Sequence, residues 1–215
     1  MSLLLAEELV LLCMDDDTGH CEVPPQDAAR GVALALVFEL TLRGFLGVEG
    51  EKFALQRTRS SDDPLLDLAA HNATALTPVD AVGKLAAEDL LQATLARLVS
   101  RGVLKDAEVW APGVHLPNDP HPEAAVRDRL RQVLAQEHDP SDHDAALVAL
   151  LHHLGIVTRV LPDESAETIR TRAEKVAARS RPMRDYQQDR VTSRKRWWDA
   201  ADLMELLAGG LNIFS

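Results

Sequence analysis

The sequence predicts a mainly α-helical protein with two small β-hairpins, and three observations support this fold class. Hydrophobic residues make up 46% of the chain, yet it has only three Trp, one Tyr and four Phe. The core must therefore consist mostly of Leu, Val and Ala, and the high helix propensity of Leu and Ala favours packed helices. Apolar segments of helical length recur, and two of them end at an Arg-Gly pair that precedes a short strand-like segment. The length of 215 residues fits one domain of ordinary size.

The first fifty residues predict two buried helices. Apolar residues cover more than one face of the segment 3–12, which indicates a helix buried on several sides. A polar turn is expected at 15–19. Arg30 then opens a second helix, whose run 32–40 is too apolar for a surface helix and too short to span a bilayer. A cation in that position indicates either a structural ion pair or an anion-binding site.

Each Arg-Gly pair is expected to end a helix and to precede a hairpin. Gly44 suits the left-handed position after the second helix, and a first hairpin is expected over 45–55 with its turn at Glu49-Gly50. One long helix is expected from Val82 to Ser100, followed by a second hairpin over 103–110.

After a proline-marked connector, the remaining chain is again expected to be helical. Four prolines between residues 112 and 122 interrupt regular structure. Further helices are expected near 123–136, 141–154, 165–178 and 197–207, and Ser141 is a suitable N-cap for the second of these.

Charge is distributed unevenly along the chain. The net charge is −11, but the segment 170–198 holds ten Lys/Arg and only three Asp/Glu. An acidic body repels phosphate-bearing surfaces at long range, so an anionic partner must meet a localised basic patch.

Cysteine content and the N-terminal segment indicate the compartment. Cys13 and Cys21 are too few for a disulfide framework, and we expect them to be reduced packing residues. The N-terminal segment lacks a basic region and contains Glu7 and Glu8, unlike a secretory signal. We therefore expect a cytoplasmic protein, either wholly in solution or peripheral at the inner face of the membrane.

The sequence contains no recognisable catalytic motif. Four histidines at 138, 143, 152 and 153 match no compact metal-ligand spacing. A glycine-rich phosphate loop and a nucleophile elbow are also missing. We therefore expect a non-enzymatic protein without a metal or other cofactor. No nucleic-acid partner is expected, because the segment 84–100 balances two cations with two acids instead of presenting a basic surface.

The basic segment ends in five residues typical of a membrane contact: Arg194, Lys195, Arg196, Trp197 and Trp198. Basic residues attract anionic head groups, and Trp favours the membrane interface. The alternative is that both tryptophans pack the last helix onto the core while the cations face the acidic body.

Several motifs together resemble the Golgi phosphoprotein 3 family. They are Leu-Leu-Ala-Glu-Glu-Leu-Val-Leu-Leu at 4–12, Asp-Asp-Thr-Gly at 16–19, Arg30-Gly31 with Glu39-Leu40 and Leu42-Arg43-Gly44, and Leu-Val-Ser-Arg-Gly-Val-Leu at 98–104. His115-Leu116-Pro117, Val126 to Leu130, and Asp144 with Leu147, Ala149 and Leu150 follow in the family's order. The resemblance covers about residues 3–161 and indicates a divergent member of bacterial type.

The resemblance implies a central apolar helical bundle ringed by amphipathic helices, with a protruding hairpin. On this basis residues 1–161 form the family-like helical domain, and 162–215 form a C-terminal helical part of the same domain. It also implies an adaptor-like peripheral membrane protein whose partner is phosphatidylinositol 4-phosphate or another anionic lipid. The alternative is a cytoplasmic protein-interaction module that kept the fold and lost the lipid pocket.

In the eukaryotic relatives, the resemblance implies a head-group pocket built from one tryptophan and three arginines. Only the arginine that opens the apolar helix has a counterpart here, Arg30. Val23, Pro24 and Pro25 occupy the region of the tryptophan, and the two later arginines fall on Glu88 and Leu91. Arg30 therefore either pairs with an acid such as Glu88 or remains an anion-binding residue.

The second hairpin corresponds to a family element that contacts membranes and mediates oligomerisation. Trp110 lies in this segment. An exposed Trp110 would favour a membrane contact, or a protein partner or second copy of the chain, whereas a buried one would favour packing against the bundle.

Overall fold

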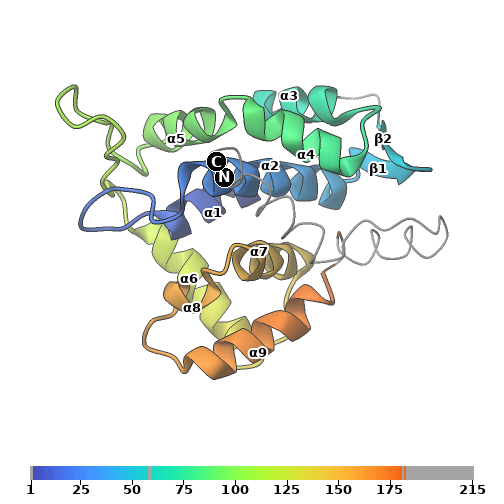
Figure 1. Ribbon diagram of the computed structural model, residues 1–215. Coiled ribbons are helices and arrows are strands. Elements are labelled where there is room, and N and C mark those ends of the chain that lie inside the picture. The colour runs from blue at the N-terminus through green and yellow to red at the C-terminus, as the bar shows by residue number, and fades with distance from the viewer. Residues whose placement is uncertain (1, 58–59, 181, 183–215) are drawn as a thin grey trace, which may run out of the picture.

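The computed structural model describes residues 2–57, 60–180 and 182, and it arranges the helices in layers around one central helix, α2 (Figure 1). The helices are α1 (Leu5–Cys13), α2 (Pro25–Leu42), α3 (Pro64–Ala73), α4 (Pro78–Ala87), α5 (Leu90–Ser100), α6 (His121–Leu134), α7 (Asp142–His153), α8 (Val157–Val160) and α9 (Ala166–Ala177). The strands are β1 (Leu46–Glu49) and β2 (Lys52–Leu55).

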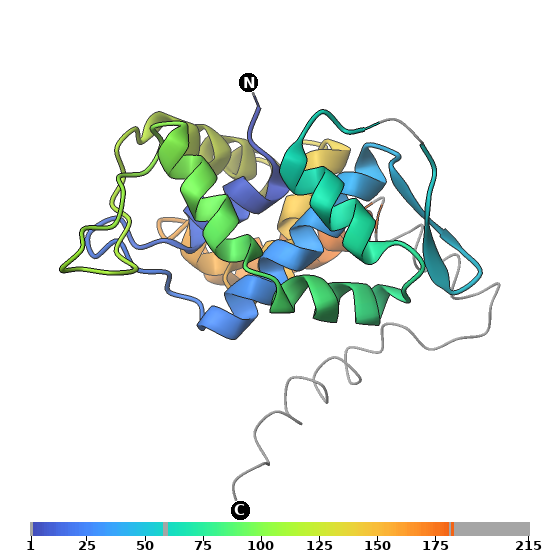
Figure 2. The same ribbon diagram turned by 90° about the horizontal axis from the view of Figure 1, so that it is seen from above.

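The middle layer consists of α1 and α2, which are the most buried helices of the described chain. Helices α3, α4 and α5 cover one side of this layer, and α6 to α9 cover the other (Figures 1 and 2). Helix α2 contacts α1, α3, α4, α5 and α7. All residues from 4 to 14 and from 31 to 40 are buried, as the apolar runs predict. The mainly helical fold with a central apolar bundle is therefore confirmed.

Two adjacent acids of α1 connect the outer layers across the middle layer. Glu7 is fully buried and accepts a hydrogen bond at 2.9 Å from Arg101, the C-cap residue of α5. Glu8 accepts one from Arg129 of α6 at 2.9 Å and lies 2.8 Å from Nε2 of His143 on α7. Neighbouring residues of a helix point about 100° apart, so α1 can present one carboxylate to each layer.

The first hairpin forms where the sequence predicts it. Strands β1 and β2 pair antiparallel with Leu46 opposite Leu55, and the turn contains Gly50 at φ +66°. Gly44, after α2, has a φ of +68°, as expected for a left-handed residue at a helix end.

The second predicted hairpin is wrong. Between residues 103 and 117 the structure has only one isolated bridge, which pairs Leu104 with Pro117. The Lys105 N–H donates to the Leu116 carbonyl at 2.8 Å, so the partner segment lies after Pro112 and not within 103–110. Proline lacks an N–H group, and Pro117 therefore cannot donate a ladder hydrogen bond at the bridge.

The single helix predicted from Val82 to Ser100 is also wrong, because the chain breaks between α4 and α5. Glu88 is extended, with φ −80° and ψ 156°. Residues five apart in a continuous helix point about 140° apart, so Leu85 and Leu90 could not both face α2. The break allows both leucines to be buried, at 0% and 2% exposure.

The helices of the second half agree with the sequence. The Ser141 hydroxyl accepts from the Asp144 N–H at 3.0 Å and caps α7 as expected. Helix α9 forms over the segment predicted to be helical and packs against α7. The helix predicted over 197–207 lies outside the described residues. Within the described chain, every helix is too short or too polar to cross a membrane.

Candidate functional site

A cavity of about 680 Å³ lies between the N-terminal half of α2, α4 and the connection from α7 to α8. We call it the α2–α4 cavity. Its lining residues are Glu22, Val23, Pro24, Asp27, Arg30, Leu34, Pro78, Val79, Asp80, Val82, Gly83, Lys84, His153, Leu154, Ile156 and Arg159. Much of this wall is apolar, and the charged groups come from four separate segments of the chain.

The start of α2 positions Arg30. Pro24 and Pro25 begin the helix, where a missing N–H is tolerated because the first turn has no intrahelical acceptor. A Cβ at Gly31 would lie 2.9 Å from Leu154 Cδ1 and 3.1 Å from Leu9 Cδ2, so α2 passes very close to its neighbours there. The close packing of Gly31 against Leu9 and Leu154 restricts the backbone next to Arg30. The Arg30 side chain lines the same cavity wall as Leu154.

Arg30 is half-buried and unpaired within the part of the chain that the structure describes. No hydrogen bond or ion pair joins it to residues 2–57, 60–180 or 182. A guanidinium group has five donors and stays charged at all physiological pH values. Arg30 therefore presents unused donor capacity to a cavity large enough for a small ligand.

Two further cations, which the sequence did not single out, line the same cavity. Lys84 extends from α4, and Arg159 comes from α8. Arg159 lies 3.6 Å from Glu22, and both side chains are about half exposed, so this ion pair is weak. The fold thus gathers Arg30, Lys84 and Arg159 from positions up to 129 residues apart in sequence.

Acids in the wall moderate the positive charge. Glu22, Asp27 and Asp80 also line the cavity. The carboxylate of Asp80 accepts from the Thr77 hydroxyl at 2.8 Å in the cap of α4, and Asp27 lies in the first turn of α2. Both carboxylates occupy helix N-termini, where the backbone dipole favours a negative charge. Part of the negative charge of the wall thus has a structural role at the starts of α2 and α4.

His153 adds a polar group that is mostly neutral at pH 7. Burial lowers its pKa below the ordinary value, and the neighbouring His152 lowers it further, while Asp27 opposes the shift. A neutral imidazole has one donor and one acceptor nitrogen. Protonation of His153 would bring a further positive charge to the cavity.

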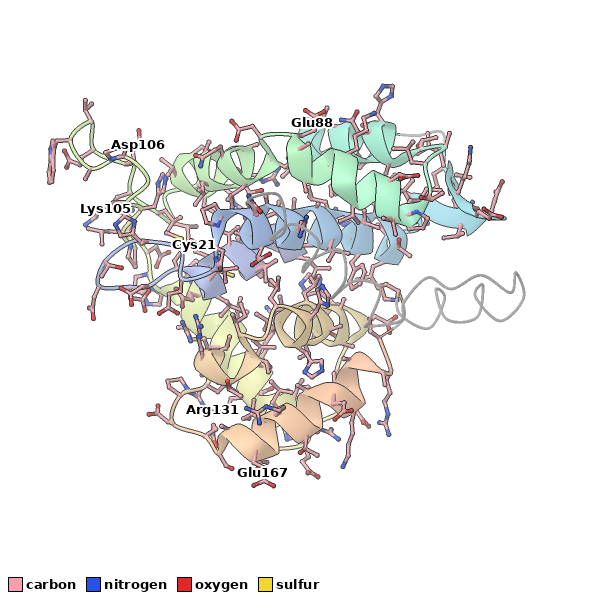
Figure 3. All side chains as sticks on the ribbon, viewed as in Figure 1. Cys21, Glu88, Lys105, Asp106, Arg131 and Glu167 are labelled. Atoms are coloured by element: carbon pink, nitrogen blue, oxygen red, sulfur yellow. The ribbon has the colours of Figure 1, made fainter. Side chains whose placement is uncertain are left out.

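The structure contains no ion pair between Arg30 and Glu88. Glu88 is the exposed residue after α4, on the outer side of the α3–α5 layer, and it does not line the cavity (Figure 3). Leu91 is also absent from the wall. The two positions that the resemblance places where the family has arginines therefore lie outside the cavity, and Lys84 is the cation that α4 supplies to it.

Trp110 belongs to the connection between α5 and α6, and this connection protrudes at the end of the molecule opposite the β1–β2 hairpin (Figures 1 and 2). Trp110 is 80% exposed and Val109 is fully exposed. The indole N–H donates to Glu108 at 3.1 Å, and the His115 N–H donates to the Gly19 carbonyl at 2.8 Å, which attaches the loop to the turn after α1. The structure thus presents Trp110 to the outside and does not pack it against the bundle.

The remaining predicted membrane contacts, Arg194, Lys195, Arg196, Trp197 and Trp198, lie outside the described residues. Of the basic segment 170–198, α9 contains Arg170, Arg172 and Lys175. Arg172 donates to the backbone carbonyls of Val133, Glu137 and His138. At least this cation has a structural role in attaching α9 to α6.

Comparison with known proteins identifies the family. The family model described as Golgi phosphoprotein 3 (GPP34) matches residues 5–196. The match extends beyond residue 161, where the resemblance seen in the sequence ends. No curated protein matches the chain.

Proposed function

Because this chain belongs to the Golgi phosphoprotein 3 family, we propose that it is a non-enzymatic, adaptor-like peripheral membrane protein that binds the anionic head group of a phospholipid in the α2–α4 cavity. The observation that carries this proposal is Arg30, whose guanidinium has no partner among the described residues and lines a cavity together with Lys84 and Arg159. The family supports an adaptor function in general, and the charges in the cavity support the lipid.

The chemistry of the cavity suits a phosphate ester. Arg30 can donate two parallel hydrogen bonds to a phosphate, while Lys84 acts as a compact point charge. Arg159 can release its weak pair with Glu22 to approach the same anion. Each hydrogen bond to a charged group contributes about 1.5–3 kcal/mol, so Arg30 is expected to contribute most of the head-group affinity.

Besides a head-group site, a peripheral membrane protein needs exposed apolar side chains that can enter the membrane interface. Val109 and Trp110 project into solvent, and Trp favours the boundary between head groups and acyl chains. We propose that this loop contacts the membrane, and that Arg194 to Trp198 add salt-sensitive attraction to anionic lipid.

The preferred lipid is proposed to be phosphatidylinositol 4-phosphate, as in the family. The cavity here differs from the family pocket, because Lys84 and Arg159 stand in for cations lost at Glu88 and Leu91. A competing proposal is that the chain is a protein-interaction module without a lipid site. The acids Glu22, Asp27 and Asp80 in the wall favour this alternative, because they repel a phosphate.

Vesicle co-sedimentation of the full chain tests the proposal. Neutral vesicles, vesicles with phosphatidylserine and vesicles with phosphatidylinositol 4-phosphate are compared at low and physiological salt. We expect selective binding to the phosphoinositide and a loss of at least roughly tenfold in affinity for Arg30→Ala, because even one lost charge-assisted hydrogen bond corresponds to about that factor. The matched control is Arg170→Ala, because Arg170 is exposed on α9 and outside the cavity.

Three other outcomes would redirect the proposal. Equal binding by Arg30→Ala and Arg170→Ala would exclude the cavity as the head-group site. Another outcome is salt-sensitive binding to every anionic vesicle that is abolished by alanine substitutions at Arg194, Lys195 and Arg196. This result would show that the basic segment, and not the cavity, binds the lipid. Absence of binding to all vesicles would leave the protein-interaction module.

A further inference from the structure

The two cysteines of the chain meet where α1 leads into α2. Cys13 is the last residue of α1, and Cys21 lies in an isolated antiparallel bridge opposite Met14. Two backbone hydrogen bonds flank this bridge. The Asp15 N–H donates to the His20 carbonyl at 2.9 Å, and the Glu22 N–H donates to the Cys13 carbonyl at 2.8 Å.

The turn between the cysteines is held by its own hydrogen bonds. The Asp15 carboxylate accepts from the Thr18 N–H at 2.6 Å, and Gly19 takes a φ of +67° that closes the turn. The register between the two cysteines is therefore fixed by local backbone geometry.

The side chains of the two cysteines interact, and the two thiols are chemically different. The interaction with Cys13 lowers the pKa of the Cys21 thiol to about 7, and the backbone N–H of Val23 adds to this shift. The interaction with Cys21 and burial both raise the pKa of the Cys13 thiol. Cys13 is 4% exposed, whereas Cys21 is half-buried and therefore more accessible to solvent.

We propose that Cys13 and Cys21 form an oxidisable dithiol, in which Cys21 is the attacking thiol and Cys13 the resolving one, and that a peroxide converts them into an intramolecular disulfide. This inference does not depend on lipid binding. A reactive cysteine is typically partly exposed and often lies close to a second thiol, and Cys21 has both properties.

The reaction balances with hydrogen peroxide as the oxidant. The Cys21 thiolate attacks one peroxide oxygen, the O–O bond breaks, hydroxide leaves, and Cys21 becomes a sulfenic acid. The Cys13 sulfur then attacks the Cys21 sulfur and forms the S–S bond. Hydroxide leaves from Cys21 and takes the Cys13 proton. The first hydroxide takes up the proton that Cys21 released when it became a thiolate. Two thiols and one peroxide therefore give one disulfide and two water molecules, and the two sulfurs lose two electrons in total.

Closing the bond needs little rearrangement. The backbone pairing of residues 13–14 with 21–22 already holds the two cysteines on neighbouring segments, and a disulfide requires an S–S distance of about 2.05 Å. Cross-linking would act on the segment directly before Glu22 and Val23, which line the α2–α4 cavity. In a reducing compartment such a bond is expected to be transient.

The sequence permits a clean assay on the full-length protein. The first Lys or Arg is Arg30, so one tryptic peptide contains both cysteines of the chain. Native protein is treated with hydrogen peroxide, alkylated with iodoacetamide and digested. We expect loss of both alkylatable thiols and a peptide lighter by two hydrogen atoms, with recovery after dithiothreitol. The same treatment in concentrated urea should form the disulfide more slowly, because the fixed contact and the shifted pKa values are lost.

Single substitutions separate the two roles. In Cys13→Ser, dimedone should trap a sulfenic acid at Cys21, because the resolving thiol is missing. In Cys21→Ser, Cys13 should stay unlabelled. Equal labelling in the two variants would overturn the assignment of roles. Native protein that keeps both thiols, yields only dimers or over-oxidised Cys21, or reacts no faster than in urea would overturn the dithiol itself.

Discussion

Replacing Glu7 with alanine should destabilise the protein strongly, because this carboxylate connects α1 to α5 inside the core. Glu7 has no exposed surface and accepts from Arg97 at 3.0 Å, from Arg101 at 2.9 Å and from the Leu4 N–H at 2.7 Å. Arg97 keeps a second partner, Asp63, at 2.7 Å. The alanine variant would leave Arg101 without this carboxylate partner and would open a void in the middle layer.

The size of the effect follows from burial. Breaking a buried ion pair by removing one partner costs about 3–5 kcal/mol. The side chains of Arg97 and Arg101 are 24% and 23% exposed, so water compensates part of the loss. We therefore expect a decrease of about 3 kcal/mol in the free energy of unfolding. For a domain of this size, such a decrease in the free energy of unfolding lowers Tm by about 6–12 °C.

Urea unfolding followed by circular dichroism measures this decrease. Glu7→Gln keeps the volume but not the charge and should lie between the wild type and Glu7→Ala. Glu174→Ala removes an exposed carboxylate from α9 and should change the free energy by less than about 0.5 kcal/mol. If Glu7→Ala lost no more than about 1 kcal/mol, the buried carboxylate would contribute little net stability and the reasoning would be refuted.

Other perturbations test the remaining contacts. Burial of His143 disfavours its charged form, but the hydrogen bond and charge of Glu8 outweigh this and raise its pKa. The resulting stabilisation is complete below the ordinary His pKa of about 6.5 and is lost as pH rises through the higher folded value, so urea titrations should show a slope there that His143→Gln removes. Gly31→Ala places a methyl group 2.9 Å from Leu154 and should destabilise the fold by about 1–3 kcal/mol, with weaker vesicle binding in co-sedimentation because Arg30 is adjacent; an unchanged Tm would mean that α2 and α7 can separate freely. Ser141→Ala removes the cap of α7 and should cost about 1 kcal/mol in thermal unfolding, whereas Ser141→Asp should retain most of it.

The helical elements were predictable because local patterns set them. The apolar runs identified α1 and α2 as buried, and Ser141 marked the start of α7, since hydrophobic periodicity and capping act within a few residues. The two errors arose where distant contacts override local preference. The segment 82–100 is continuous in helical propensity, but packing on α2 requires the break at Glu88. The segment after Arg101 resembles a strand, but it pairs with residues beyond Pro112.

The candidate site was predictable only at Arg30. The start of an apolar helix beside a polar turn is visible in sequence, whereas the replacement of family arginines at Glu88 and Leu91 remains a prediction from the resemblance. Lys84 and Arg159 carry no local signal, because each is a single charge on an otherwise ordinary helix. Their relevance depends on the cavity that brings them toward Arg30.

The sequence by itself determined the fold class, the family and the buried character of the first two helices. These properties follow from composition, periodicity and motif order, which are local or additive along the chain. Tertiary structure alone decided which charges are partnered. Glu7 and Glu8 are adjacent in sequence, yet each binds a different layer, and Arg30 has no partner among the described residues although acids are frequent in this chain. Ion pairing depends on distances of a few ångströms between distant segments, and only the packed helices fix those distances.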